Sequence, residues 1–221
     1  MNKQINSKKT HTNIKIDKIP LSSAQQRFFL MSNYFENSDV YNMSLGITIN
    51  KDLNKDKLRK ALITLSQSNS TLSIVFNNHD GKVTQSLTKI DDDNLPFDFI
   101  ELRNKKYSNS DNIRPILRKF IKKPFDINGG ILWRFLLIKI NSNKFYIYLV
   151  MHHLISDAWS FASFFRKLSS IYMDKNFIPI KDNYFLKTFI PNELKYLKDV
   201  QAISTDQLFW KTYLNEDFSE L

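Results

Sequence analysis

The sequence predicts an α+β fold, an α/β sandwich in which helices pack on a mixed, largely antiparallel sheet. Two apolar segments, 131–140 and 145–151, are long enough for core strands, and the Asn141-Ser142-Asn143 turn between them makes them antiparallel neighbours. Other segments alternate like strands or repeat with helical spacing, giving five or six strands and four or five helices in mixed order. Such a mixed order is typical of helices packed on a sheet.

Composition limits the possible classes. The 221 residues are 42% hydrophobic, enough for the core of one large domain or two small ones. Only 4 glycines and 6 prolines occur, which argues against general disorder. The absence of cysteine excludes disulfides, thiolate zinc sites and cysteine nucleophiles. No apolar run is long enough to cross a bilayer.

The net charge of +10 raises the question of nucleic-acid binding. However, lysine and arginine are spread along the chain with acidic residues among them, and there is no arginine-rich block or aromatic-basic signature. We therefore expect neither a nucleic-acid nor a membrane partner. Two explanations of the charge stay open: a solvated lysine surface from biased composition, or attraction to an acidic protein partner.

The amino-terminal elements follow from local signals. Residues 1–18 are basic, lack the apolar core of a signal peptide, and are expected to form a flexible leader of a cytoplasmic protein. Ser22 and Gln25 have the spacing of a capping box, which predicts a helix through Tyr34. Residues 41–50 alternate apolar with polar side chains, as a half-buried strand does.

The next segment predicts a helix and a hairpin. Asn54 is expected to cap a helix, and the hairpin consists of a strand through residues 72–76, a turn at 78–81 and a returning strand at 83–87. Residues 91–94 are polar and predict a solvated loop. The apolar face of the capped helix consists of Leu58, Ala61, Leu62 and Leu65.

The remaining predicted elements lie in the second half of the chain. Asp111 is expected to cap a helix through Ile121, with Pro115 in its first turn, where the missing donor costs little. Residues 174–200 are expected to be less regular, and an amphipathic stretch follows them. Large apolar groups so near a terminus normally need something to pack against. They are Phe209, Trp210, Tyr213 and Leu214.

The segment 151–160 is the centre of the functional interpretation. It begins at the end of the core strand 145–151 and runs into a helix predicted from the apolar spacing of residues 159–172. His152, His153 and Asp157 therefore lie in a turn between a buried strand and an amphipathic helix. Burying polar groups at the end of a core strand is unfavourable unless they form hydrogen bonds or have a functional role.

The two histidines have several possible explanations. Adjacent strand residues point to opposite faces and no third ligand cluster is visible, so the sequence predicts no metal site. A serine-hydrolase triad is disfavoured because the strained Gly-x-Ser-x-Gly turn is missing. Two alternatives stay open. His153 is a satisfied core histidine with Asp157 as a helix cap, or it is an acyltransferase base that takes a proton from an amine or hydroxyl, with Asp157 folding back to orient the site.

At this point three stretches resemble one family. Residues 151–160 resemble the His-His-x-x-x-Asp-Gly motif of nonribosomal peptide synthetase condensation domains. Residues 21–27 resemble the family's opening Ser-x-Ala-Gln helix. Pro124-Phe125-Asp126, with residues 130–134, resembles its Pro-Phe-Asp segment before the core strand. The resemblance covers residues 19–215 and implies that 19–221 form the amino-terminal lobe of such a domain, a lobe of the chloramphenicol acetyltransferase type.

The resemblance implies a reaction and a set of roles. An acceptor amine attacks a donor thioester, each carried on the phosphopantetheine arm of a peptidyl or acyl carrier protein, and no cofactor binds the domain directly. The resemblance places His153 at the reaction centre, gives His152 a supporting role and makes Asp157 structural. It also implies that the residues after the aspartate support the substrate channel: Ala158, Trp159 and Ser160.

The sequence departs from the family pattern in three ways. Ala158 replaces the family glycine. Ser68 and Ser73 align with the two arginines of the family's Arg-His-Glu-x-Leu-Arg-Thr-x-Phe stretch. The chain is also about half as long as a two-lobed domain, so the carboxy-terminal lobe, or a second copy of the chain, would be needed as a partner. Two hypotheses remain: a catalytic lobe of an amide-forming acyltransferase, or a noncatalytic lobe that docks carrier proteins or a partner enzyme.

Overall fold

A computed structural model describes residues 18–34, 39–102, 110–174 and 177–214. The chain divides into two compact units, residues 1–182 and 183–221, which are described separately. In chain order the elements of the first unit are α1 (Ser23–Tyr34), β1 (Asn42–Ile49), α2 (Lys55–Ser68), the 3₁₀ helix η1 (Ser70–Ser73), β2 (Ile74–His79), β3 (Lys82–Leu87), β4 (Phe97–Glu101), α3 (Ser110–Lys122), β5 (Trp133–Asn141), β6 (Lys144–His152) and α4 (Ala158–Met173).

The main sheet has the strand order β1-β6-β5-β4, and β2 pairs with β3 in a separate hairpin. β6 is antiparallel to both β1 and β5, whereas β4 is parallel to β5. The prediction of an α+β fold with a largely antiparallel sheet is therefore confirmed. The two apolar segments are the central strands β5 and β6, as expected from their composition.

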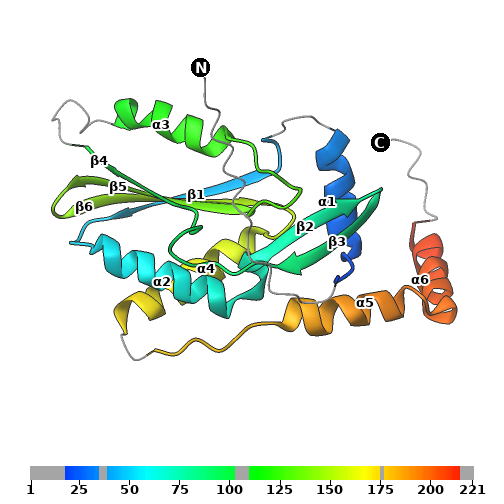
Figure 1. Cartoon of the computed structure of the whole chain (residues 1–221). Helices are drawn as coiled ribbons and strands as arrows, with labels where there is room; N and C mark the ends of the chain where they lie inside the picture. The colour runs from blue at the N-terminus through cyan, green and yellow to red at the C-terminus, as the bar shows by residue number, and fades with distance from the viewer. Residues whose placement is uncertain (1–17, 35–38, 103–109, 175–176, 215–221) are drawn as a thin grey trace, which may run out of the picture. The chain divides into compact units, whose positions relative to one another are not determined.

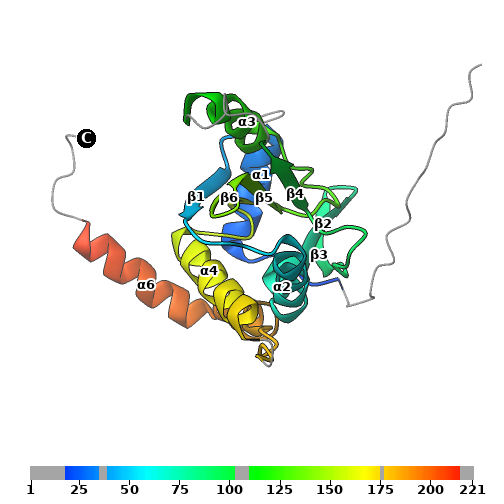
Figure 2. The same ribbon diagram turned by 90° about the vertical axis from the view of Figure 1, so that its left-hand side faces the viewer.

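Helices cover both faces of this sheet (Figures 1 and 2): α3 lies over one face, and α2 and α4 lie over the other. Because side chains alternate along a strand, β5 contacts both layers. Trp133 and Phe135 pack against Phe164 of α4. On the other face, Leu136 and Ile138 form a buried cluster with Ile113 of α3. The core thus lies on both sides of β5 and β6, and it fixes the point where β6 ends.

Local capping signals predicted the helix starts correctly. The backbone N–H of Gln25 donates to Ser22 Oγ at 3.2 Å, and the backbone N–H of Ser22 donates to Gln25 Oε1 at 3.0 Å, which is the predicted capping box. Asn54 caps α2 by accepting from the backbone N–H of Lys57. The predicted apolar face of α2 is buried throughout. β1 also forms over the predicted range.

The predicted hairpin is present, with one difference at its start. Asp80 and Gly81 turn the chain with positive φ angles of 52° and 81°, which favours glycine and tolerates aspartate. Leu72, expected in the first strand, lies instead in η1. Its carbonyl accepts a hydrogen bond from the Trp133 indole at 2.9 Å, so a tertiary contact takes the place of strand pairing.

Three further expectations need correction. The sequence did not predict β4, a short strand whose parallel partner β5 lies far along the chain. Pro115 was expected in the first turn of its helix but lies inside α3, because the helix begins at Ser110. Asp111 was expected to cap this helix but lies inside it for the same reason. The side chain of Asp111 and the leader over residues 1–17 lie outside the described residues.

The second unit is more helical than predicted. Residues 174–200, expected to be less regular, contain the π-helix η3 (Phe185–Phe189) and α5 (Ile190–Tyr196). Pro191 stands at the start of α5, where proline is tolerated. The amphipathic stretch forms α6 (Val200–Tyr213), capped by Asp199. Phe209, Trp210 and Tyr213 contact one another and are 58%, 54% and 66% exposed. No helix among the described residues is long and apolar enough to cross a membrane.

Candidate active site

The two histidines stand where β6 leaves the sheet. The backbone N–H of His152 donates to the carbonyl of Leu132 at 2.9 Å, and that of His153 donates to the carbonyl of Tyr41 at 3.0 Å. Leu132 precedes β5 and Tyr41 precedes β1, so the ends of both neighbouring strands hold this turn. Because successive strand residues point to opposite faces, the two imidazoles have different surroundings.

His152 is enclosed and held in one tautomer. The residue is 2% exposed, and its ring contacts the rings of Tyr41 and Phe125. Its Nδ1 accepts the backbone N–H of Leu154 at 3.1 Å, and its carbonyl accepts the hydroxyl of Ser156 at 3.0 Å. Burial, followed by the charge of neighbouring His153, lowers the pKa of His152 to about 4. His152 is therefore neutral at pH 7 and holds the turn in shape.

His153 is half-buried and oriented by stacking. Its imidazole lies parallel to the ring of Phe28 in α1, with centroids 4.6 Å apart and an interplanar angle of 12°. No residue in the described part of the chain forms a hydrogen bond to either ring nitrogen of His153. Stacking on Phe28 is therefore the contact that holds the ring of His153 among the described residues.

Asp157 caps α4. Its Oδ1 accepts from the backbone N–H and the hydroxyl of Ser160 at 2.9 and 2.7 Å, and its own N–H donates to Ser160 Oγ at 3.0 Å. The hydroxyl of Ser160 is the main reason that the pKa of Asp157 is lowered, and the charge of His153 is a minor reason. No hydrogen bond joins Asp157 to His152 or His153 within the described residues. The role of Asp157 in orienting the site or holding its architecture together stays a prediction, and the cap of α4 is the interaction that its carboxylate makes.

The other predicted channel residues lie at the start of α4. Ala158 is its first residue and is exposed, and no positive φ angle occurs there. The alanine is accordingly tolerated by the backbone where the family has glycine. Trp159 is 82% exposed and so presents a large apolar surface to solvent. Among the described residues, no group of three potential ligands could hold a metal ion.

A buried pair of glutamines supports the turn that follows the two histidines, and the sequence did not predict this pair. Gln25 Nε2 donates to Gln85 Oε1 at 3.2 Å, and Gln85 Nε2 donates back to Gln25 Oε1 at 3.0 Å. Gln25 Nε2 also donates to the carbonyl of Leu154, immediately after the histidine pair, at 3.4 Å. The sequence indicated Gln25 only as part of the capping box. Its partner Gln85 lies 60 residues away, so spacing could not reveal the pair.

Arg134 is a second support, and its role was not evident from the sequence. Its guanidinium donates to the carbonyls of Phe120, Ile121 and Lys123 at the end of α3. It also lies over the ring of Phe125, 4.1 Å from the centroid, and Phe125 packs edge-on against His152. Burial lowers the pKa of Arg134 to about 10, so it stays charged at neutral pH. Arg134 thereby ties α3 to the segment that covers His152.

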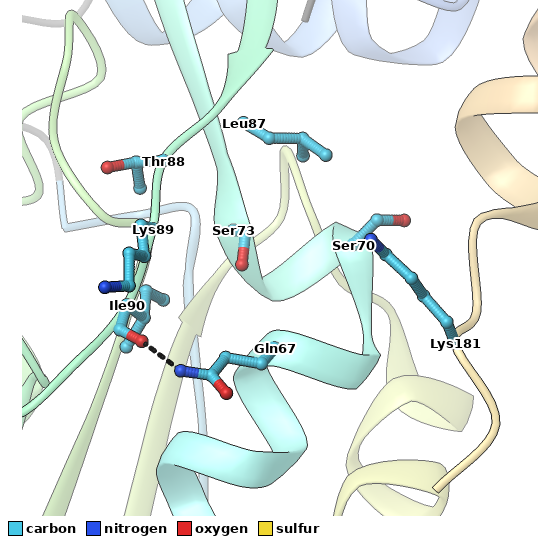
Figure 3. Close-up of a pocket in the computed structure, with 8 residues that line it drawn as sticks. All are labelled: Gln67, Ser70, Ser73, Leu87, Thr88, Lys89, Ile90 and Lys181. Atoms are coloured by element: carbon cyan, nitrogen blue, oxygen red, sulfur yellow. Dashed lines mark hydrogen bonds between the residues drawn. The ribbon is translucent and has the colours of Figure 1, made fainter. Parts of the chain in front are cut away.

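The serines that replace the family arginines lie in a different part of the unit. Ser68 and Ser73 are both buried and donate to the backbone carbonyls of Leu65 and Ser66. Ser73 lines a cavity of about 330 Å³ (Figure 3). The cavity lies among the end of α2, η1 and the segment after β3, and it includes none of the predicted site residues. Its lining is Gln67, Ser70, Ser73, Leu87, Thr88, Lys89, Ile90 and Lys181.

Comparison with known proteins agrees with this geometry. A family model described as "Condensation domain" matches residues 15–221. Bacitracin synthase 2 from Bacillus licheniformis is 29% identical over 75% of this chain, which spans 6% of that protein. Tyrocidine synthase 3 from Brevibacillus parabrevis is 27% identical over 75% of the chain and 2% of its own length. The chain therefore corresponds to a small part of these relatives.

Solved structures show the same fold. The starter condensation domain of rhizomide synthetase RzmA has a TM-score of 0.78 at 17% identity, covering 93% of this chain and 49% of that one. The first condensation domain of the calcium-dependent antibiotic synthetase, in complex with a substrate analogue, has a TM-score of 0.77 at 17% identity, covering 91% and 48%. The chain thus spans about half of each solved domain, and the predicted chloramphenicol acetyltransferase-like fold is confirmed.

Proposed function

Since this chain belongs to the condensation-domain family, we propose that it supplies the histidine-bearing half of an amide-forming acyltransferase. The donor is an acyl or aminoacyl thioester on one carrier protein, and the acceptor is an aminoacyl group on another. The observation that carries this proposal is the asymmetry of the histidine pair. His152 is buried and hydrogen-bonded, whereas the ring of His153 is held by stacking and has no hydrogen bond to a described residue.

His153 is the residue that handles the proton. The acceptor nitrogen attacks the thioester carbonyl, the C–N bond forms, and the C–S bond to the phosphopantetheine arm breaks. The proton lost by the amine passes through His153 to the departing thiolate, which leaves as a thiol. A neutral imidazole suits this exchange because one ring nitrogen can accept a proton and then pass it on.

The neighbouring residues position His153 and take no part in the proton transfer. His152 stays neutral and fixes the turn through Leu154 and Ser156. Asp157 starts α4 at a defined point by bonding Ser160. Ala158, Trp159 and Ser160 then form one wall of the substrate channel, with exposed Trp159 as its large apolar contact.

A second candidate function is a noncatalytic lobe that docks carrier proteins or a partner enzyme. Two observations favour it for the chain by itself. It spans about half of the solved condensation domains, and serines 68 and 73 stand where the family has arginines. Catalysis between two tethered substrates needs both walls of a channel, because the reaction depends on their relative positions. We therefore propose that a carboxy-terminal lobe, or a second copy of the chain, completes the site.

Complementation separates the two functions. The chain would be joined to the carboxy-terminal half of a condensation domain and given two carrier proteins loaded with aminoacyl groups, with mass spectrometry of the carrier-bound products. Dipeptide on the acceptor carrier supports the catalytic proposal. Carrier binding without any product, in a folded two-lobed assembly, would instead establish the docking function.

A further inference from the structure

We infer that the exposed basic face of α3 is a docking surface for the acidic face of a carrier protein, an inference that rests on the proposed function. The outward side of this helix and the residue that follows it carry only cations among the charged residues whose side chains are described. They are Arg114, Arg118, Lys119, Lys122 and Lys123, and all are exposed. These five residues make up the α3 basic face.

Three of these five cations have no ion-pair partner among the described residues. Arg118, Lys119 and Lys123 form no ion pair with any residue that the structure describes. Lys122 has one loose partner, Asp39, at 3.7 Å, and both side chains are largely accessible to solvent. An exposed pair of this kind contributes little to stability. The charges of Arg118, Lys119, Lys122 and Lys123 are therefore the ones that we expect an outside partner to meet.

Three of the four cations of α2 provide a comparison. Arg59 binds Asp92 at 2.9 Å, and Lys57 lies over the ring of Tyr172 at 4.6 Å. Lys55 pairs with Asp56 and also lies over the ring of Phe99. Lys60, the fourth cation of α2, is exposed and forms no ion pair with a described residue. In α3 and just after it, Arg118, Lys119 and Lys123 are exposed and form neither an ion pair nor a ring contact with a described residue. The helix itself lies over one face of the sheet (Figure 2).

The spacing of the cations fits a protein helix. Arg118 and Lys122 are four residues apart, as are Lys119 and Lys123, so they form two adjacent rows on one side of the helix. From residue 118 to residue 123 the helix advances roughly 8 Å. A patch of this length matches a short row of carboxylates on one partner helix. Extended nucleic acid would call for a longer basic track.

The α3 basic face also adjoins the candidate active site. Asn42 Nδ2 donates to the carbonyls of Ile121 and Lys123 at 2.9 and 3.1 Å, and Asn42 is the register partner of His152. Phe125, two residues beyond Lys123, contacts the ring of His152. A carrier protein held on α3 would therefore stand next to the turn that bears His153, where its phosphopantetheine arm is needed.

Charge reversal with a matched control tests this surface. The full chain carrying Arg118→Glu, Lys119→Glu and Lys123→Glu would be compared with Lys51→Glu, Lys60→Glu and Lys82→Glu. The control lysines are exposed, and they form no ion pair with described residues. Both variants change the net charge equally. A third variant with glutamine at the three α3 positions removes the charges without opposing the helix dipole. Circular dichroism melting establishes that each variant is folded.

The readout is the association rate of a phosphopantetheine-loaded peptidyl carrier protein of negative net charge, measured by stopped-flow fluorescence at low and high salt. We expect the α3 reversal to slow association about 10-fold or more at low ionic strength, with a smaller loss for the glutamine variant. The control triple should slow it less than about 3-fold, because its charges lie away from the docking face.

Two results would overturn the inference: equal losses in both triples, or no loss in the α3 triple. His153→Ala keeps this inference distinct from the catalytic proposal. If His153→Ala binds the carrier protein at the parent rate but forms no product in the two-lobed assembly, and the α3 triple binds slowly, both proposals are supported. If the α3 triple binds normally while His153→Ala abolishes product, docking on α3 is wrong and the catalytic proposal survives.

Discussion

Acidification should destabilise this protein through one histidine, His152. Burial lowers its pKa from 6.5 to about 4 in the folded state. A histidine whose folded pKa is depressed favours folding only while it is neutral. Its contribution is therefore fully present above pH 6.5 and is lost as the pH falls through the folded pKa. Between pH 6.5 and pH 4 the unfolded chain binds more protons than the folded chain, so the free energy of unfolding decreases over that interval.

The size of the effect follows from the shift. One pKa unit corresponds to 1.36 kcal/mol, so a depression from 6.5 to about 4 predicts a loss of about 3 kcal/mol at most. Such a loss is a large fraction of the stability of an ordinary domain. Protonation would also break the hydrogen bond that His152 Nδ1 accepts from the backbone N–H of Leu154, which holds the turn.

Urea denaturation followed by circular dichroism at pH values from 7.5 to 4 measures the effect. His152→Asn removes the titrating group and places an amide oxygen near the position of Nδ1. The loss of unfolding free energy between pH 6.5 and pH 4 should therefore be smaller by about the predicted amount. His79→Asn, at an exposed position in β2, is the matched control and should leave the wild-type slope in place. Wild type and His152→Asn losing stability in parallel over this interval would refute the assignment of the slope to His152.

Three further predictions follow from the same contacts. Asp157→Ala should lower the free energy of unfolding by about 0.5–2 kcal/mol because it removes the cap of α4; an unchanged melting temperature together with lost activity would indicate a direct chemical role. Arg134→Met should lower the free energy of unfolding by about 3 kcal/mol or more, because three carbonyls lose a charged donor. Arg134→Lys should recover only part of this stability in urea denaturation, and full recovery would contradict the requirement for a planar guanidinium. The chain by itself should be inactive and self-associate, since Phe209, Trp210 and Tyr213 are more than half exposed; a monomer in light scattering that forms dipeptide at a normal rate would contradict this.

Local signals predicted the elements whose causes are local. The capping box of Ser22 and Gln25, the cap at Asn54 and the hairpin turn at Asp80 and Gly81 all depend on residues within a few positions of one another. The central strands were recognisable because they are apolar throughout, and the start of α4 because Asp157 precedes a helical pattern. Together these features predict correctly that the histidine pair lies at the end of a core strand.

Features that depend on distant residues were missed. β4 pairs in parallel with β5, and Leu72 meets Trp133, across long stretches of sequence. The different surroundings of His152 and His153 arise from Phe125, Tyr41 and Phe28, which come from three other segments. The role of Arg134 likewise exists only when α3 ends beside β5. Spacing in one sequence carries no information about such contacts, because they are made by tertiary packing.

The most direct test of the proposed function is single-turnover amide formation by a two-lobed assembly with both carrier proteins loaded. His153→Ala should lower the rate by about 10²–10⁴-fold, since a positioned proton acceptor contributes about that much. Its melting temperature should stay close to that of the parent, because the half-buried imidazole forms no hydrogen bond through its ring with a described residue. His79→Ala, the exposed control, should keep the parent rate. Turnover by His153→Ala within a few-fold of the parent, in a folded assembly, would contradict the assignment of His153 as the proton-handling residue.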